Sequence, residues 1–188
     1  ISKNTDGSMT HTCWGEIAEN SKRFANYLTT LNLKASDRVA TIAWNNHRHL
    51  ETWYGISGSG LVCHTINPRL FPEQLSFIVN DADDQVLIFD KTFVNLVLSI
   101  KANIPKVKQF ICLDAYDADI AQIFPDLQFY DDLIEHQSMQ FTWPKLDENT
   151  ASSLCYTSGT TGNPKGVLYS HRSTVLHSYA SSWRDSFN

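Results

Sequence analysis

The residues best suited to chemistry lie in one ten-residue segment, 157–166, with the sequence TSGTTGNPKG. The segment contains three glycines, a proline, a lysine and four hydroxyl side chains. Glycine accepts positive φ angles and close backbone approach, so successive N–H groups can turn toward an anion. The hydroxyls add rotatable donors, and Lys165 adds a positive charge on a flexible stem. This combination matches a polyphosphate, and the ligand that it implies is ATP.

The same composition is also typical of a flexible turn or linker, and composition alone does not separate the two interpretations. The order of the residues is more informative. Two residues separate Gly162 from Lys165, and a glycine follows the lysine, whereas a P-loop has the pattern G-x-x-x-x-G-K-[ST]. The order therefore disfavours a P-loop NTPase.

The sequence YTSGTTGNPKG at 156–166 resembles the phosphate-binding motif of the adenylate-forming superfamily. This superfamily includes acyl- and aryl-CoA synthetases, firefly-type luciferases and the adenylation domains of peptide synthetases. Upstream, 37–46 and 64–83 resemble the pattern of fatty-acyl-CoA synthetases in order and spacing, and 66–75 is most similar to the medium- and long-chain enzymes. Ser36 departs from the family, which usually has glycine there; we expect this to affect only a turn.

The resemblance implies a fatty-acid:CoA ligase that uses ATP to form an acyl-adenylate with release of pyrophosphate, and then makes the CoA thioester. It implies that the magnesium-binding carboxylate, the adenine and ribose contacts and a distal catalytic lysine lie beyond Asn188, so that Mg²⁺ has no ligand residue here. The chain is then an amino-terminal part that we expect to be inactive alone. Another adenylate-forming enzyme and an inactive nucleotide-binding fragment remain alternatives. The residues implied to wrap the β- and γ-phosphates are Thr157, Ser158, Gly159, Thr160, Thr161 and Gly162, with Lys165 as their charge partner and the catalytic residue.

Helices and short apolar strands alternate along the first part of the chain. Apolar residues three and four apart predict a helix over 12–31 with Thr12 as its cap, and one over 47–59 with Leu50, Trp53, Tyr54 and Ser57 on one face. Pro72 suits the first turn of a further helix. The remaining predicted helices are 92–102, 131–136 and a segment capped by Ser170, and the predicted strands are 38–44, 61–66, 85–90, 107–113, 152–156 and 166–170.

This alternation predicts an α/β fold with a parallel sheet flanked by helices, because parallel neighbours need a crossover between them. By resemblance, it is the amino-terminal subdomain of an acetyl-CoA-synthetase-like fold, followed by the start of a second subdomain. We predict a layered subdomain over 1–113, a connecting segment over 114–150 that is rich in acidic residues and irregular, and a phosphate-binding strand-loop-strand-helix unit over 151–188.

Composition limits the class of protein. Fifteen Lys and Arg against 20 Asp and Glu give a formal charge of -5, which offers no general attraction for nucleic acid. No apolar run approaches the length of a transmembrane helix. The four cysteines are scattered, three of them in apolar strand-like runs, which favours a reduced, cytoplasmic protein. The chain begins at Ile1, so organellar targeting stays open.

Several other residues invite chemical interpretations that we do not favour. His171 follows the segment 157–166, but a histidine at the start of a helix usually has a local structural role. His47 and His49 are two residues apart and point in different directions on a helix, so we predict no metal site. The role of Arg69 is left open. Core packing, rather than ligand stacking, is predicted for Trp14, Trp44 and Trp53.

Overall fold

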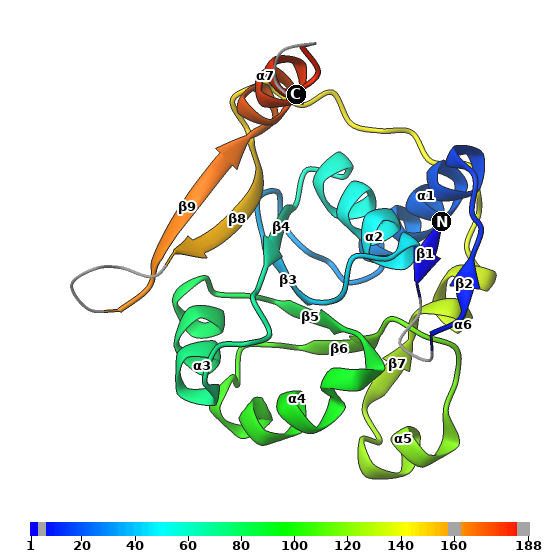
Figure 1. Ribbon diagram of the computed structural model, residues 1–188, viewed down its shortest axis with the longest axis vertical. Coiled ribbons are helices and arrows are strands. Elements are labelled where there is room, and N and C mark those ends of the chain that lie inside the picture. The colour runs from blue at the N-terminus through cyan, green and yellow to red at the C-terminus, as the bar shows by residue number, and fades with distance from the viewer. Residues whose placement is uncertain (4–6, 158–162, 184–188) are drawn as a thin grey trace.

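A computed structural model describes residues 1–3, 7–157 and 163–183 of the 188-residue chain. Its centre is a seven-stranded sheet in the order β7-β6-β5-β3-β4-β8-β9 (Figure 1). All neighbouring strands are parallel except β8 and β9, which pair antiparallel. The predicted α/β fold with a parallel sheet and flanking helices is confirmed.

The described elements follow the predicted alternation closely. Their bounds are β1 Ser2–Lys3, β2 Met9–Thr10, α1 Trp14–Thr29, β3 Arg38–Ile42, α2 His47–Gly58, β4 Val62–Thr65, α3 Pro72–Asp81, β5 Val86–Phe89, η1 Lys91–Phe93, α4 Val94–Ile100, η2 Lys101–Asn103, β6 Gln109–Cys112, α5 Ala118–Ile123, β7 Leu127–Phe129, α6 Tyr130–Glu135, β8 Ala151–Thr157, β9 Lys165–Ser170 and α7 His171–Ser181.

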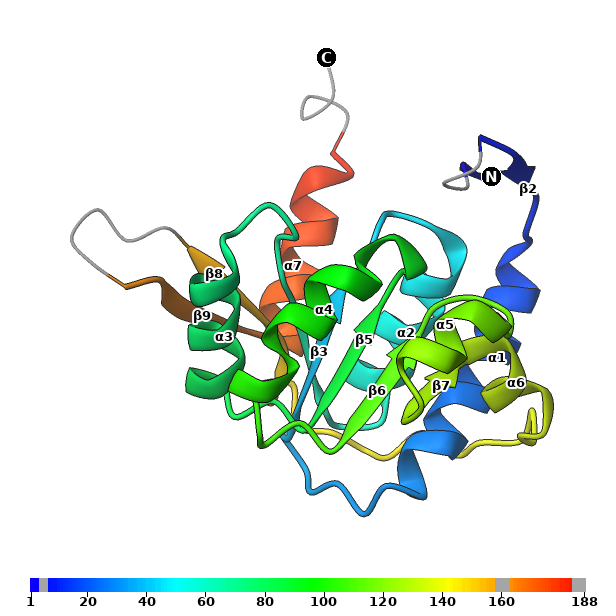
Figure 2. The same ribbon diagram turned by 90° about the horizontal axis from the view of Figure 1, so that it is seen from below.

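Helices cover both faces of the sheet (Figures 1 and 2). On one face, Leu75 of α3, Val97 of α4 and Phe124 after α5 pack against alternate strand residues such as Leu87. On the other face, α1, α2 and α6 pack against the intervening strand residues, with Phe24, Ile56 and Tyr130 in the core. Strand side chains alternate between the two faces, so each strand contributes to both cores.

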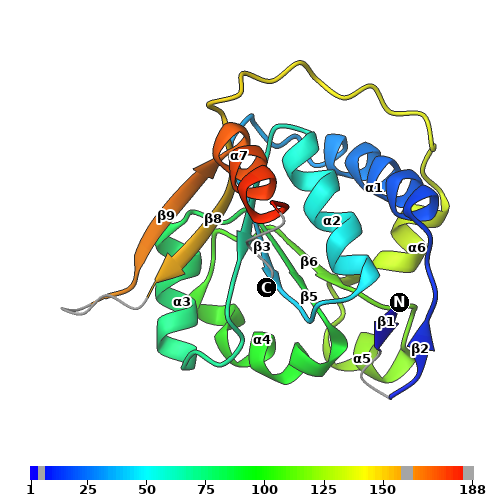
Figure 3. The same ribbon diagram turned by 45° about the horizontal axis from the view of Figure 1, so that its top comes forward.

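The segment 114–150 is not only a connection. It contains α5, β7 and α6, and β7 extends the sheet by pairing with β6. Phe124 and Tyr130 from this segment are fully buried in the two cores. Its longest stretch without helix or strand is 136–150, which runs across the molecule from α6 to β8 (Figure 3). The domain boundaries at 113 and 150 stay a prediction, while the sheet itself crosses both of them.

Two local predictions were wrong. Cys13, not Thr12, precedes α1, and its main-chain N–H donates to Glu16 Oε2 at 2.8 Å. Trp14 and Trp44 do not lie in the core: their exposed fractions are 71% and 41%. Periodicity identified the helix face on which Trp14 lies, and Phe24 and Leu28 on that face are buried, but the described residues leave Trp14 in the first turn exposed.

None of the helices in the described ranges is long and apolar enough to cross a membrane.

Candidate functional site

The β8–β9 hairpin carries the residues predicted to bind phosphate. Thr157 is the last residue of β8 and pairs directly with Lys165, the first residue of β9. The Thr157 hydroxyl is 3.5 Å from the main-chain oxygen of Lys165, to which it donates. Ser158, Gly159, Thr160, Thr161 and Gly162 lie outside the described residues. The structure thus brings together the two flanks of the predicted site.

The strand before the site is anchored in the sheet. β8 pairs with β4 in parallel register, with Ser153 opposite Cys63, and Ser152 and Leu154 are buried. β9 is exposed along most of its length and ends at Ser170, whose hydroxyl caps α7 by accepting from Ser173 N–H at 3.1 Å. The site therefore has one rigid side, β8, and one side, β9, that depends on β8 for its position.

The Lys165 side chain is exposed, and it makes no ion pair with any residue that the structure describes. Its neighbour Gly166 lies against the Tyr156 ring: a Cβ at Gly166 would be 3.2 Å from Tyr156 Cζ and from Leu154 Cδ1. Glycine at this position therefore permits close approach of the two strands next to Lys165.

A polar network at the base of the hairpin was not predicted from the sequence. The Tyr156 hydroxyl donates to Asp81 Oδ2 at 2.6 Å, and the Tyr156 ring lies 5.2 Å, centroid to centroid, from the ring of His64. His64 and Asp84 are fully buried, with His64 Nδ1 2.8 Å from Asp84 Oδ2. Burial raises the pKa of Asp84, although the contact with His64 opposes this shift.

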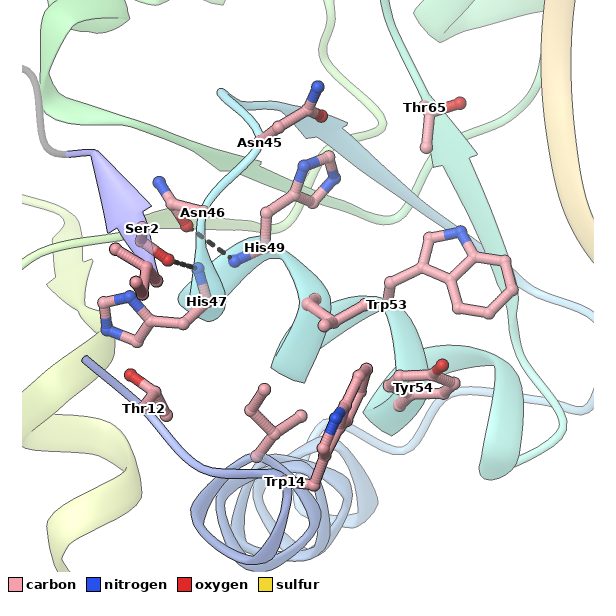
Figure 4. A pocket seen from close by; sticks show the side chains of 13 residues that line it. Ser2, Thr12, Trp14, Asn45, Asn46, His47, His49, Trp53, Tyr54 and Thr65 are labelled. Atoms are coloured by element: carbon pink, nitrogen blue, oxygen red, sulfur yellow. Dashed lines mark hydrogen bonds between the residues drawn. The ribbon is translucent and has the colours of Figure 1, made fainter. Parts of the chain in front are cut away.

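A cavity of about 690 Å³ lies beyond the carboxyl ends of β3 and β4, between these strands, α1 and the start of α2 (Figure 4). Its wall combines aromatic and polar side chains. Asn46 caps α2 by accepting from His49 N–H at 2.9 Å, and the Ser2 hydroxyl accepts from His47 N–H at 2.9 Å. The labelled residues that line it are Ser2, Thr12, Trp14, Asn45, Asn46, His47, His49, Trp53, Tyr54 and Thr65.

The two histidines beside this cavity differ, because the His49 ring has two partners whereas His47 Nδ1 is buried with no hydrogen-bond partner among the described residues. The His49 ring contacts Trp44 O at 3.2 Å through Nδ1 and Thr41 Oγ1 at 3.1 Å through Nε2. Burial lowers the pKa of both His47 and His49, which favours their neutral forms. Over the described ranges, no three His, Cys, Asp or Glu side chains are grouped so as to hold a metal ion.

The model of the family described as AMP-binding enzyme matches residues 4–188. The chain belongs to this family. Its relatives include a 3-methylmercaptopropionyl-CoA ligase from Ruegeria lacuscaerulensis, 60% identical over 98% of the chain, and a medium-chain-fatty-acid–CoA ligase from Ectopseudomonas oleovorans, 50% identical over all of it. The chain spans 34% of the length of each, about a third.

Solved structures of the AMP-binding enzymes share the fold. A red-emitting luciferase from Phrixothrix hirtus matches 93% of this chain and 42% of its own, with a TM-score of 0.82 and 21% identity. The N-terminal domain of FACL13 from Mycobacterium tuberculosis matches 94% of this chain and 41% of its own, with a TM-score of 0.76 and 26% identity. The sheet and its helices are therefore the architecture of this family.

Two candidates from the sequence, His171 and Arg69, lie outside the hairpin. His171 begins α7, and its main-chain N–H donates to Thr150 O at 3.0 Å, which is a local structural contact. Arg69 is exposed and has no ion pair with any described residue; its N–H donates to Asn67 Oδ1 at 3.0 Å. Neither side chain forms a hydrogen bond or ion pair with the described residues of the hairpin, and a nucleotide contact for His171 stays a hypothesis.

Proposed function

We propose that this chain is the amino-terminal part of an ATP-dependent acyl-CoA synthetase, in which the β8–β9 hairpin holds the β- and γ-phosphates of ATP. One observation carries the proposal: on the two sides of 158–162, the hairpin places the exposed residue Thr157 opposite Lys165, whose ammonium group has no ion pair with any described residue. Family membership and the CoA ligases among the relatives support the reaction class.

The reaction begins when an oxygen of the substrate carboxylate bonds to the α-phosphorus of ATP. The bond from that phosphorus to the bridging oxygen breaks, and pyrophosphate leaves with the electron pair. Negative charge on the departing group rises in the transition state, so donors fixed around it favour the transition state over the ground state. Lys165 supplies charge for this purpose, and the hydroxyl of Thr157 together with those of Ser158, Thr160 and Thr161 supplies donors.

The second half-reaction joins the acyl group to coenzyme A. The CoA thiolate bonds to the acyl carbon, and AMP leaves. No described residue of this chain is assigned to CoA, adenine, ribose or Mg²⁺; under the proposal, these ligands bind to residues that follow 188. The acid is a small carboxylic acid of the fatty-acid kind, because the two relatives described above are named for 3-methylmercaptopropionate and medium-chain fatty acids.

The cytoplasmic location stays a prediction that rests on the unpaired cysteines. Cys63 and Cys112 are buried as predicted, whereas Cys155 is only half-buried and Cys13 is exposed.

The reaction can be tested by following the reading frame past Asn188 and assaying the full-length product for ATP–pyrophosphate exchange with medium-chain fatty acids. We expect Lys165→Ala to slow exchange about 100-fold, since that is the order of loss when one charge-stabilising donor is removed. The same substitution is expected to change the free energy of unfolding by less than about 0.5 kcal/mol, because the side chain is exposed and has no ion pair with a described residue.

Lys108→Ala is the matched control, because Lys108 is also an exposed lysine, located just before β6 and remote from the hairpin. It should leave exchange unchanged. Exchange at the wild-type rate in Lys165→Ala would refute the role of the hairpin, and a full-length protein without any exchange activity would refute the proposed reaction.

A further inference from the structure

Among the described residues, β8 is the only strand that pairs with β9, the strand that carries Lys165. β9 pairs with β8, and its residues from Lys165 to Tyr169 are exposed. Tyr156 is one residue before the end of β8 and directly opposite Gly166. Its ring fills the space over Gly166, where a Cβ would be only 3.2 Å away. The location of the Tyr156 ring thus sets how β9 approaches β8 beside Lys165.

The Tyr156 ring is held from a different part of the chain. Its hydroxyl donates to Asp81 Oδ2 at 2.6 Å across 75 positions of sequence, and Asp81 is the last residue of α3. Burial, the hydrogen bond and the Asp81 charge raise the pKa of Tyr156, so the phenol keeps the proton that it donates. A donor to a carboxylate makes a stronger hydrogen bond than a neutral pair does.

The segment 81–84 that holds Tyr156 is itself fixed at each position. Arg38 of β3 donates to the main-chain oxygen of Ala82 and lies 3.2 Å from Asp83 Oδ2, and Lys106 Nζ is 2.8 Å from Asp83 Oδ1. Asp83 has a positive φ of 56°, which gives the turn after α3 a defined shape. Asp84 then reaches into the core to His64.

His64 forms the second support of the same ring. It lies on β4, the neighbour of β8, and is fully buried with its Nδ1 on Asp84. Its ring lies beside that of Tyr156 at a centroid distance of 5.2 Å and an angle of 43°. One turn therefore supplies both carboxylates. Asp81 accepts from the hydroxyl of Tyr156, and Asp84 contacts the imidazole of His64 beside the Tyr156 ring.

We infer that Tyr156 and Asp81, backed by His64 and Asp84, form a positioning device that fixes the open end of the β8–β9 hairpin for ATP. Tyr156 is a positioning residue, not a catalytic residue. It acts through Thr157, which follows it in β8, and through Lys165, which pairs with Thr157 from β9. This inference rests on the proposed function, and it adds a requirement that the phosphate-binding motif alone does not contain, namely an acceptor oxygen on the side chain at position 81.

The test uses the full-length enzyme and separates the Michaelis constants of the two substrates. In Tyr156→Phe and in Asp81→Ala, we expect KM for ATP to rise about three- to tenfold, since each variant removes one hydrogen bond to a charged group while the ring or the helix remains. KM for the fatty acid should not change. Asp81→Asn keeps an acceptor oxygen and should restore most of the wild-type KM for ATP.

The double variant Tyr156→Phe/Asp81→Ala should have a KM for ATP no higher than the worse of the single variants, because both substitutions break the same bond. Tyr169→Phe removes a hydroxyl from the other end of the same hairpin, opposite Ser153, and should behave as wild type. Thermal unfolding of all the variants checks that the fold is retained.

An unchanged KM for ATP in Tyr156→Phe, or additive effects in the double variant, would overturn the inference. So would a lower melting temperature with a reduced kcat and both KM values unchanged, because that pattern describes a purely structural contact. A different result refutes the role of the hairpin in the proposed function, namely exchange at the wild-type rate in Lys165→Ala. If Lys165→Ala loses exchange while Tyr156→Phe keeps its affinity for ATP, only the positioning device is refuted.

Discussion

Substitution of Phe124 provides a quantitative test of whether 114–135 is part of the core of the layered subdomain. Its side chain has an exposed fraction of 0% and lies between the rings of Phe89 and Phe110, at centroid distances of 6.2 Å and 5.2 Å. The Lys101 ammonium is 4.2 Å from the Phe124 ring centroid, a cation–π distance. Replacement of a fully buried phenylalanine by alanine costs about 3–5 kcal/mol, through lost burial and the cavity that remains. We therefore expect Phe124→Ala to lower the free energy of unfolding by about that amount.

Ile123→Ala is the matched control, one residue earlier, at the end of α5, with a side chain that is 54% exposed. It should cost less than about 1 kcal/mol. Urea unfolding followed by circular dichroism measures both variants, with an unchanged m-value as the sign that only stability has changed. For a chain of this size, the loss in Phe124→Ala corresponds to a drop in Tm of roughly 6–20 °C. If the two variants differed by less than about 1 kcal/mol, the segment would not be integrated into the core, and our description of it would be wrong.

Two further predictions concern buried ionisable groups. Burial raises the pKa of Glu51, although hydrogen bonds from Asn20 and Tyr130 oppose the shift. A raised folded-state pKa means that the protonated form contributes stability below the unfolded pKa of about 4.3, and that this contribution is lost as pH rises above it. The free energy of unfolding of the wild type relative to Glu51→Gln should accordingly fall as pH is raised from about 4, and a constant difference would contradict this assignment. Among the thiols, exposed Cys13 should react with a disulfide reagent in the native protein. Burial raises the pKa of Cys112 to about 12 and should protect that thiol until denaturant is added. Equal reaction rates of the two thiols in the native protein would contradict the core placement of Cys112.

Local sequence patterns predicted most of the sheet because each strand in its centre is an apolar run that follows a turn. The predicted strand 38–44 corresponds to Arg38–Ile42, and 85–90 corresponds to Val86–Phe89. Parallel strands buried on both faces give continuous apolar runs, which are easy to recognise. Pro72 marked the start of α3 correctly for the reason expected, since proline fits the first helical turn.

The pattern was less informative at the side of the sheet formed by β7. The acidic residues and Pro125 suggested an irregular connection, yet the outward Gln128 between the buried Leu127 and Phe129 is the alternation of a short strand. Three residues are too few for this period to stand out from chance. Trp14 was misplaced for a different reason: its spacing identifies a helix face, but spacing does not reveal which residues of that face are covered by the rest of the fold.

The candidate site, too, was predicted only in part from the sequence. The residue types and order in 157–166 predicted phosphate chemistry, and the structure places the predicted pair Thr157 and Lys165 directly opposite each other. The contact between Tyr156 and Asp81 could not be predicted, because it joins residues 75 positions apart whose neighbourhood depends on strand order. A tyrosine before a loop and a carboxylate at a helix end are each ordinary features, and only the folded arrangement makes them partners.

The location of β9 at the end of the strand order has a consequence for the newly made chain. Within the described ranges, β9 pairs with β8 alone, and it exposes three successive apolar side chains, Val167, Leu168 and Tyr169. A row of free backbone N–H and C=O groups accepts a strand from another molecule as readily as one from its own, which favours aggregation. Lysine is the residue that natural sheets most often place on such strands to oppose self-association. The charge of Lys165, at the first position of β9, therefore disfavours pairing of this strand with another copy of the chain.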